Sequence, residues 1–160
     1  MNCSVLMLSR NLNLLSEIDL TKKLPKRFNT PVLRDIKFKN ECLYITDSFS
    51  AKNHRGNNCV HVVEVATLNW IRTIGEAILN SPVSIHITDT EIAVLERSNQ
   101  GAIKYFSNSG EYLKITHVSE SRYPTSFIEL DSNFTIVNDQ KNLISIYGTD
   151  KIKSEICNIS

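Results

Sequence analysis

The sequence predicts an all-β protein built from repeated four-stranded antiparallel units. The first observation is a recurrence: a proline opens a strand-like run at Pro31, Pro82 and Pro124, with spacings of 51 and 42 residues. The second is that each opening is followed by further short runs rich in β-branched and aromatic residues, which favour strands. Units of this length, each made of short strands, are typical of β-propeller blades. We therefore expect a partial β-propeller of about three and a half blades in a single domain over residues 1–160.

The N-terminal segment, residues 1–24, predicts half a blade. Ser4–Leu8 matches the third strand of a unit, Arg10-Asn11 matches a turn, and Leu12–Ile18 matches the fourth strand. A helix over Leu8–Leu24 is the alternative, since leucines there also recur at a spacing of three to four residues. Consistency with the other units favours the strands.

Three full blades are predicted to follow, over residues 31–75, 81–118 and 123–157. The clearest hairpin turn among them is Asn108-Ser109-Gly110, because glycine and asparagine accept a positive φ. The longer spacing of the first repeat is explained by a polar insertion, Ser48–Asn57, between its second and third strands. Such insertions belong in exposed loops.

Composition and charge exclude several function classes. The chain has 18 basic and 17 acidic residues and a net charge of +1, so no overall field favours nucleic acid or a membrane surface. No apolar stretch approaches the length of a membrane span, and no secretory leader is recognisable. The four cysteines form no Cys-x-x-Cys motif, which fits a reducing compartment. The expected location is cytoplasmic, with no membrane partner.

The repeats resemble those of a known family, the NHL-repeat six-bladed β-propellers. In that family the second strand ends in Asp and an Asn follows a few residues later; here Asp139 and Asn142 have the family's separation, and Asp47 supplies the Asp of the first full unit. The middle unit departs from the pattern, with Glu96 in place of Asp and Asn99 followed by a two-residue delay. WD-repeat and kelch propellers match less well, because Gly-His, Trp-Asp and double-glycine pairs are missing.

The resemblance covers roughly residues 4 to 156 and implies a ligand-binding module rather than a chemistry. Family members bind proteins, some bind RNA, and others are enzymes such as an amidating lyase and gluconolactonase-like metal enzymes. Without a Cys-x-x-Cys motif, this chain has no zinc module of the kind that tripartite-motif ubiquitin ligases carry.

A zinc site near Cys59 and His61, with His54 in the adjacent loop, is one candidate. Zinc needs four convergent donors at recognisable spacings, and these residues do not show them. An alternating strand with a buried thiol is the favoured interpretation, so no metal ligand is assigned.

Carboxylates follow the second strand of each full unit, at Asp47, Glu96 and Asp139. A metal enzyme of the lactonase type would need such groups to converge at one mouth, but equivalent positions in repeats more often bond the adjacent turn. The serines near His86 and His117 lie in no recognisable nucleophile motif. We therefore expect no catalytic residues and no cofactor, and we regard a propeller hydrolase or lyase as an alternative only.

A basic stretch lies between the half blade and the first full blade. Its cations are Lys22, Lys23, Lys26 and Arg27. Residues 22–39 carry a net charge of +6, which leaves −5 for the rest of the chain and could hold phosphates. RNA binding through this stretch is an alternative function, although aromatic stacking partners are few and a solvated linker is favoured.

His54 and Arg55, near the tip of the insertion, are candidate partner contacts because long loops on rigid scaffolds often carry function. Three and a half blades cannot close a six-bladed ring, and open sheet edges invite pairing with other chains, including self-association. The sequence thus predicts a non-catalytic β-propeller scaffold for protein–protein interaction.

Overall fold

Short strands form three four-stranded antiparallel sheets and one two-stranded sheet. A computed structural model describes residues 3–49, 56–98, 101–118 and 123–128, together with the backbone of 129–130, 133–138, 143–148 and 155–158. The chain is therefore a partial β-propeller, as the repeats predict, and each sheet follows the sequence order of its strands.

The N-terminal hairpin consists of β1 (Ser4–Leu8) and β2 (Leu14–Asp19), followed by the short helix α1 (Leu20–Lys23). The first full blade contains β3 (Leu33–Lys39), β4 (Cys42–Asp47), β5 (Cys59–Glu64) and β6 (Asn69–Ile74). The second contains β7 (Pro82–Ile87), β8 (Glu91–Glu96), β9 (Ala102–Ser107) and β10 (Tyr112–His117). The third contains β11 (Pro124–Leu130), β12 (Asn133–Asn138), β13 (Leu143–Gly148) and β14 (Glu155–Asn158).

The alternative of a long helix over residues 8–24 is wrong. β1 and β2 pair in antiparallel register over Ser4↔Asp19 to Met7↔Ser16, and only α1 is helical. Asp19 caps α1 by accepting a hydrogen bond from the Thr21 N–H at 3.1 Å, which is the usual role of Asp at a helix start. The pairing of β1 with β2 explains why the leucines of this segment support strands.

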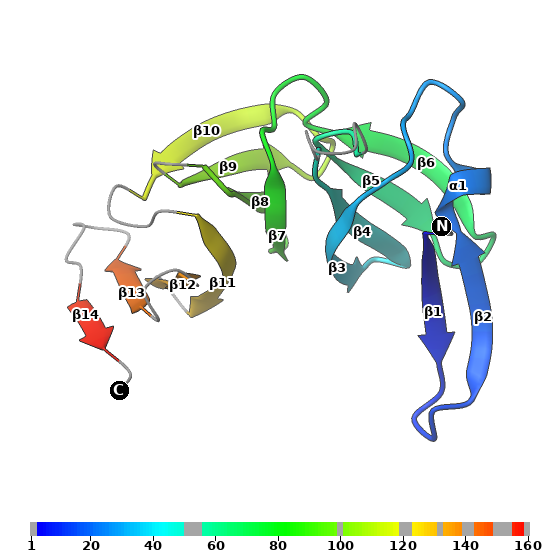
Figure 1. The fold of residues 1–160 in the computed structure, drawn as a ribbon, viewed down its shortest axis with the longest axis horizontal. Helices are drawn as coiled ribbons and strands as arrows, with labels where there is room; N and C mark the ends of the chain where they lie inside the picture. The colour runs from blue at the N-terminus through cyan, green and yellow to red at the C-terminus, as the bar shows by residue number, and fades with distance from the viewer. Residues whose placement is uncertain are drawn as a thin grey trace.

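The sheets lie side by side in an arc around an open centre, and β3, β7 and β11 are the innermost strands (Figure 1). Polar bonds fix neighbouring blades. The Asp35 carboxylate accepts hydrogen bonds from the Ser84 hydroxyl at 2.8 Å and the Ile85 N–H at 3.0 Å. Farther out, the Arg72 guanidinium donates to the carbonyl oxygens of Asn108 and Ser109.

The first two full blades bury apolar side chains on both faces, because a sheet lies on either side of each. In β4, Tyr44 faces the second blade, while Leu43 and Ile45 face the hairpin. In β8, Val94 faces the first blade and Leu95 faces the third. This explains why the second and third strands read as nearly continuous apolar runs rather than as an alternation of apolar and polar residues.

Among the described residues, the interface between the first two blades holds the largest cluster of buried apolar side chains. It contains Tyr44, Val60, Val62, Ile74, Leu79, Ile85, Ile92, Val94 and Phe106. The cluster under the hairpin holds Ile18 and Leu20 against the first blade, so the hairpin is docked at its base. No helix among the described residues has the length and apolar character needed to cross a membrane.

Candidate functional site

A buried polar cluster lies where the insertion loop leaves and rejoins the first blade. Asp47 is the last residue of β4 and Cys59 is the first of β5, and the two residues are paired in register. His61 is two residues farther along β5 and so points to the same face as Cys59. Sheet geometry therefore brings together three side chains that an eleven-residue segment separates in sequence.

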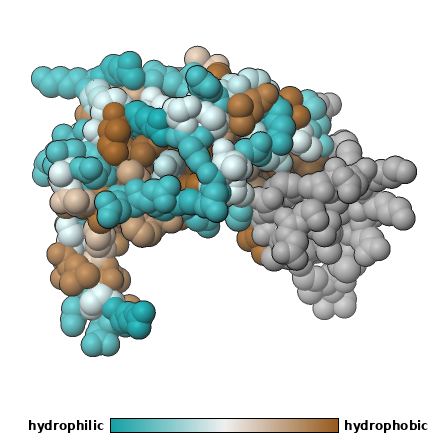
Figure 2. Space-filling model, turned by 180° about the vertical axis from the view of Figure 1, so that it is seen from behind, coloured by the Kyte–Doolittle hydropathy of each residue, from teal (hydrophilic) through white to brown (hydrophobic). Residues whose placement is uncertain are grey.

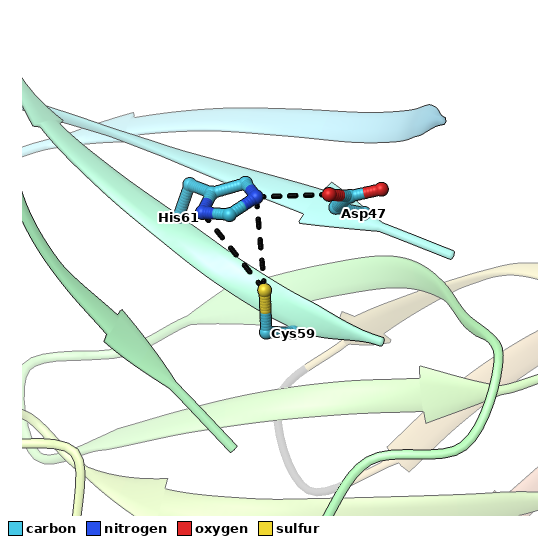
Figure 3. A group of neighbouring side chains, drawn as sticks. All are labelled: Asp47, Cys59 and His61. Atoms are coloured by element: carbon cyan, nitrogen blue, oxygen red, sulfur yellow. Dashed lines mark hydrogen bonds and ion pairs between the residues drawn. The ribbon is translucent and has the colours of Figure 1, made fainter. Parts of the chain in front are cut away.

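The three side chains converge within the sheet, as Figure 3 shows. His61 Nε2 donates to Asp47 Oδ2 at 2.9 Å, and Cys59 Sγ lies 3.7 Å from His61 Nε2. The side chains of Asp47 and His61 are both 0% exposed. Asp47 also accepts hydrogen bonds from the Val32 N–H at 2.7 Å and from Asn57 Nδ2 at 2.6 Å. The carboxylate is thus held by backbone and side-chain donors in a position shielded from water.

The Cys59 thiol is not an activated nucleophile. Burial raises its pKa, and the neighbouring Asp47 carboxylate adds to the effect, so the group is protonated at neutral pH. Nucleophilic cysteines instead have a lowered pKa and access to solvent. Phe28 covers the cluster, with its ring edge-on to the His61 ring at 5.2 Å. The buried, protonated thiol therefore suits a structural role or ion binding rather than catalysis.

The second blade repeats the polar part of this arrangement with different residues. Glu96, the last residue of β8, accepts hydrogen bonds from the Asn80 N–H and from Lys104 Nζ, the latter at 2.9 Å. Lys104 is the third residue of β9, as His61 is the third of β5. Ala102 occupies the position that corresponds to Cys59. A carboxylate that ties the chain before the first strand to a nitrogen donor on the third strand is thus common to both blades.

These contacts fit the structural role expected of the carboxylates after the second strands. Asp47 and Glu96 each accept a backbone N–H from the segment that precedes the first strand of their blade. Neither is a free ligand at a shared mouth, which removes the support that these two residues gave to a lactonase-type metal enzyme. Asp139 lies outside the described residues.

The cations of the basic stretch lie beside α1, and most have partners. Lys22 pairs with Asp19 at 3.1 Å, and Arg27 pairs with Glu76 at 3.0 Å. Lys23 donates to Asn69 Oδ1 at 3.3 Å. Lys22 and Lys26 line a hollow of about 460 Å³ formed by residues 20–31. The pairing lowers the positive potential that RNA would meet, so RNA binding stays a prediction without structural support.

His54 and Arg55, the candidate partner contacts of the insertion, lie outside the described residues. The base of the insertion is described, and it is well anchored. Asn58 Oδ1 accepts the Phe49 N–H at 2.7 Å and the Ser81 N–H at 2.9 Å. The insertion therefore starts and ends at fixed points beside the buried cluster.

A second feature of interest is the hairpin of β1 and β2, whose apolar side chains face solvent. Five leucines of the hairpin are between 48% and 77% exposed: Leu6, Leu8, Leu12, Leu14 and Leu15. Figure 2 shows hydrophobic surface along this projection, at lower left, above a hydrophilic tip. A groove of about 380 Å³ lies between β1 and the innermost strand β3, lined by Ser4, Val5, Leu6, Leu33, Arg34, Asp35, Ile36 and Ile45.

Sequence reasoning considered Cys59 and His61 apart from Asp47, and it did not identify the groove. The signal for the cluster was available, because residues at the two ends of a hairpin loop are cross-strand neighbours. The long insertion separates Asp47 from Cys59 in sequence, so the two were not recognised as neighbours. The groove has no local signal, since it exists only where β1 approaches β3 in space.

Comparison with solved structures places the chain in a class of folds. It superposes on β-propellers: a Dos1 propeller with a TM-score of 0.63 at 10% identity, over 98% of this chain and 43% of that one. It also superposes on the Pan2 WD40 domain of Neurospora crassa with a TM-score of 0.63 at 14% identity, over 94% of this chain and 41% of that one. Hydrazine synthase of Kuenenia stuttgartiensis matches with a TM-score of 0.60 at 13% identity, over 83% of this chain and 36% of that one.

These similarities establish a β-propeller fold, with the chain spanning roughly two fifths of the length of each of those proteins. The sequence matches no known protein family and no curated protein. Similarity at 10–14% identity defines the fold alone, so the NHL resemblance stays a prediction.

Proposed function

We propose that this chain is a non-catalytic β-propeller scaffold, and that a protein partner adds an extended strand to the edge of β1 that no described strand covers. The observation that carries the proposal is the unequal strand count. Three sheets have four strands, whereas the described part of the N-terminal sheet has two, and β1 is its inner strand. The groove between β1 and β3 lies at the place where a further strand would pair with β1.

The hydrogen-bonding phase of the hairpin supports this use of β1. The Leu20 N–H donates to the Cys3 carbonyl at 3.0 Å, so Cys3 and Leu20 form a hydrogen-bonded pair of the antiparallel ladder. Hydrogen-bonded and non-hydrogen-bonded pairs alternate along such a ladder. The backbone N–H and C=O groups of Ser4 and Leu6 therefore point away from β2, toward the open edge.

The side chains around this edge suit an extended apolar segment. Val5, Leu33 and Ile45 give the groove an apolar floor, with Arg34 and Asp35 as a polar rim. The Ser4 hydroxyl is buried and has no hydrogen-bond partner among the described residues, so an added backbone could supply one. Strand addition draws affinity from main-chain hydrogen bonds and specificity from pockets for alternate side chains.

A pair of substitutions at Leu6 tests the proposal. Leu6→Pro removes an outward-facing N–H without removing a bond to β2, and its ring suits the extended backbone of an edge strand. Leu6→Ala shortens the same exposed side chain but keeps the N–H. We expect partners cross-linked to the wild-type chain in a cell extract, and identified by mass spectrometry, to be retained by Leu6→Ala and lost with Leu6→Pro.

The outcomes separate the occupants of the edge. Partners that bind Leu6→Pro as well as they bind the wild type would show that β1 is not the contact. A dimer of the wild type that Leu6→Pro dissociates in sedimentation experiments would replace the partner protein with a second copy of this chain. Far-UV circular dichroism of both variants serves as the folding control.

A further inference from the structure

We propose that Asp47, Cys59 and His61 form a metal site suited to Zn²⁺ at the base of the insertion in the first blade. The site is independent of strand addition at β1. A carboxylate oxygen, a thiol sulfur and an imidazole nitrogen all lie within 4.8 Å of one another, and all three residues are buried. Thiolate and imidazole together are the donors that zinc prefers over magnesium and calcium.

The two distances from His61 Nε2 to the other donor atoms are close to those of tetrahedral coordination. With ordinary zinc–nitrogen, zinc–sulfur and zinc–oxygen bond lengths, tetrahedral angles separate N from S by about 3.6 Å and N from O by about 3.3 Å. Cys59 Sγ is 3.7 Å from His61 Nε2, and Asp47 Oδ2 is 2.9 Å from the same nitrogen. Ion binding requires the carboxylate oxygen to withdraw by a few tenths of an ångström, and three protein donors leave one position for a water molecule.

Charge balance favours the ion in this dry environment. When zinc binds, the proton of the neutral His61 ring moves from Nε2 to Nδ1, which frees the Nε2 lone pair for the metal. The Cys59 S–H bond breaks, the Zn–S bond forms and the thiol proton leaves to solvent. The thiolate and the Asp47 carboxylate then carry two negative charges, which one Zn²⁺ neutralises. A neutral assembly avoids the penalty of an uncompensated buried charge.

The surroundings of Asp47 are those of an oriented ligand. Ligating carboxylates are commonly held by hydrogen bonds from outside the coordination shell, which fix their direction. Here the Val32 N–H bonds Oδ1 at 2.7 Å and Asn57 Nδ2 bonds Oδ2 at 2.6 Å. Cys59 and His61 are likewise fixed, since both belong to β5, a strand paired on both sides.

The second blade shows which of these residues are needed to hold the segment before the first strand to the third strand, which we call the structural task. In the second blade, Glu96 and Lys104 hold the same chain segments together with Ala102 in the place of Cys59. The structural task therefore requires a carboxylate and a nitrogen donor, but no thiol. Of the two blades with described side chains, only the first combines imidazole and thiol donors around its carboxylate.

An ion at this position would cross-link two neighbouring strands. It would join the end of β4 to the start of β5, across the base of the longest insertion in the chain. Closing a loop at its base offsets the entropy that the loop costs on folding. Because an ion of this kind binds the folded chain, its binding free energy adds to stability.

Titration of the purified full chain with Co²⁺ and Zn²⁺ tests the site. Cobalt bound to a thiolate has a sulfur-to-metal charge-transfer band, and we expect one ion per chain with this band, displaced by Zn²⁺. Cys59→Ala copies Ala102 of the second blade and should abolish the band and weaken zinc binding by at least roughly 100-fold, beyond the usual effect of a supporting residue. Cys42→Ala, which removes a half-buried thiol outside the cluster, should change neither.

A second variant keeps the test decisive. Cys59→Ala combined with His61→Lys gives the first blade the carboxylate–lysine pair of the second, so it should fold and should show no rise of Tm with Zn²⁺, unlike the wild type. A wild-type chain without the charge-transfer band would overturn the proposal. So would equal zinc affinity in Cys59→Ala, or loss of the band in Cys42→Ala.

Discussion

Replacing Asp47 with asparagine tests how much the buried carboxylate contributes to the first blade. The amide oxygen can still accept the Val32 N–H, which lies 2.7 Å from Oδ1. The amide nitrogen then takes the place of Oδ2 and faces the Asn57 amide nitrogen, which now has no acceptor there. The hydrogen bond from His61 Nε2 to Oδ2 is lost for the same reason.

The magnitude follows from those two losses. A hydrogen bond to a charged group contributes about 1.5–3 kcal/mol, and two such bonds to the Asp47 carboxylate are lost. Since one of the three bonds survives, we expect Asp47→Asn to lower the free energy of unfolding by about 3 kcal/mol, the lower end of the sum for two bonds. Glu96→Gln is the matched control in the second blade. Its amide oxygen can retain both donors that Glu96 Oε1 accepts, but the largely buried Lys104 ammonium loses its charge partner, so we expect a loss of about 2 kcal/mol.

Urea unfolding in the presence of EDTA, followed by tryptophan fluorescence, measures both effects without a contribution from bound metal. Trp70 is the only tryptophan of the chain and lies in β6 of the first blade, so its emission reports on this region. The reasoning is refuted if Asp47→Asn unfolds within 0.5 kcal/mol of the wild type, a shift of the size seen at ordinary surface sites. It is equally refuted if Glu96→Gln is the more destabilising of the two.

Three further outcomes are expected. Gly75→Ala should cost about 2–4 kcal/mol in urea unfolding, because Gly75 has a φ of +72° and an added Cβ would lie 2.6 Å from the Leu79 side chain. Gly110→Ala, where the nearest atom to an added Cβ is 3.2 Å away, should cost less. The reverse order of the two losses would contradict this account. Cys59 should react with a thiol reagent far more slowly than Cys42 in the folded chain, because burial raises its pKa; equal rates, measured by mass spectrometry, would exclude this. If RNA binds the basic stretch, its affinity should fall steeply with salt and should decrease when the cations Lys22, Lys23, Lys26 and Arg27 are neutralised. Filter binding of a single-stranded RNA measures this affinity, and an unchanged affinity in the neutralised variant would eliminate that function.

Local patterns were sufficient to predict most strands. The proline-led openings predict β7 and β11, and the Asn108-Ser109-Gly110 turn predicts the hairpin of β9 and β10. The ends of elements were harder to place. Residues Asp19 to Lys23 form a cap and a helical turn that the strand pattern did not anticipate, because the cap depends on a bond between the Asp19 side chain and the Thr21 N–H. Antiparallel neighbours joined by short turns are encoded locally, and this is why the blades could be predicted.

The candidate site was only partly predictable. The carboxylates after the second strands were expected to bond adjacent turns, and the contacts of Asp47 and Glu96 agree with this expectation. The contact of Cys59 and His61 with Asp47 was not predicted, because it depends on cross-strand register across an insertion. Likewise, the partners of Arg27 and Lys39 lie about fifty residues away, at Glu76 and Asp89, so the charge of the basic stretch could not be judged from sequence.

By itself, the sequence determined the repeat and the strand order within each blade, whereas β5, which was expected to alternate, is buried at five consecutive positions. The repeat and the strand order depend on periodicity, turn residues and neighbouring strands, which are all local. The tertiary structure decided which side chains meet between blades, which cations are neutralised, and where β1 leaves an edge beside β3. Those properties depend on how sheets pack against one another, and residues far apart in sequence determine that packing. The buried cluster and the open edge, on which both proposals rest, therefore exist only in the folded chain.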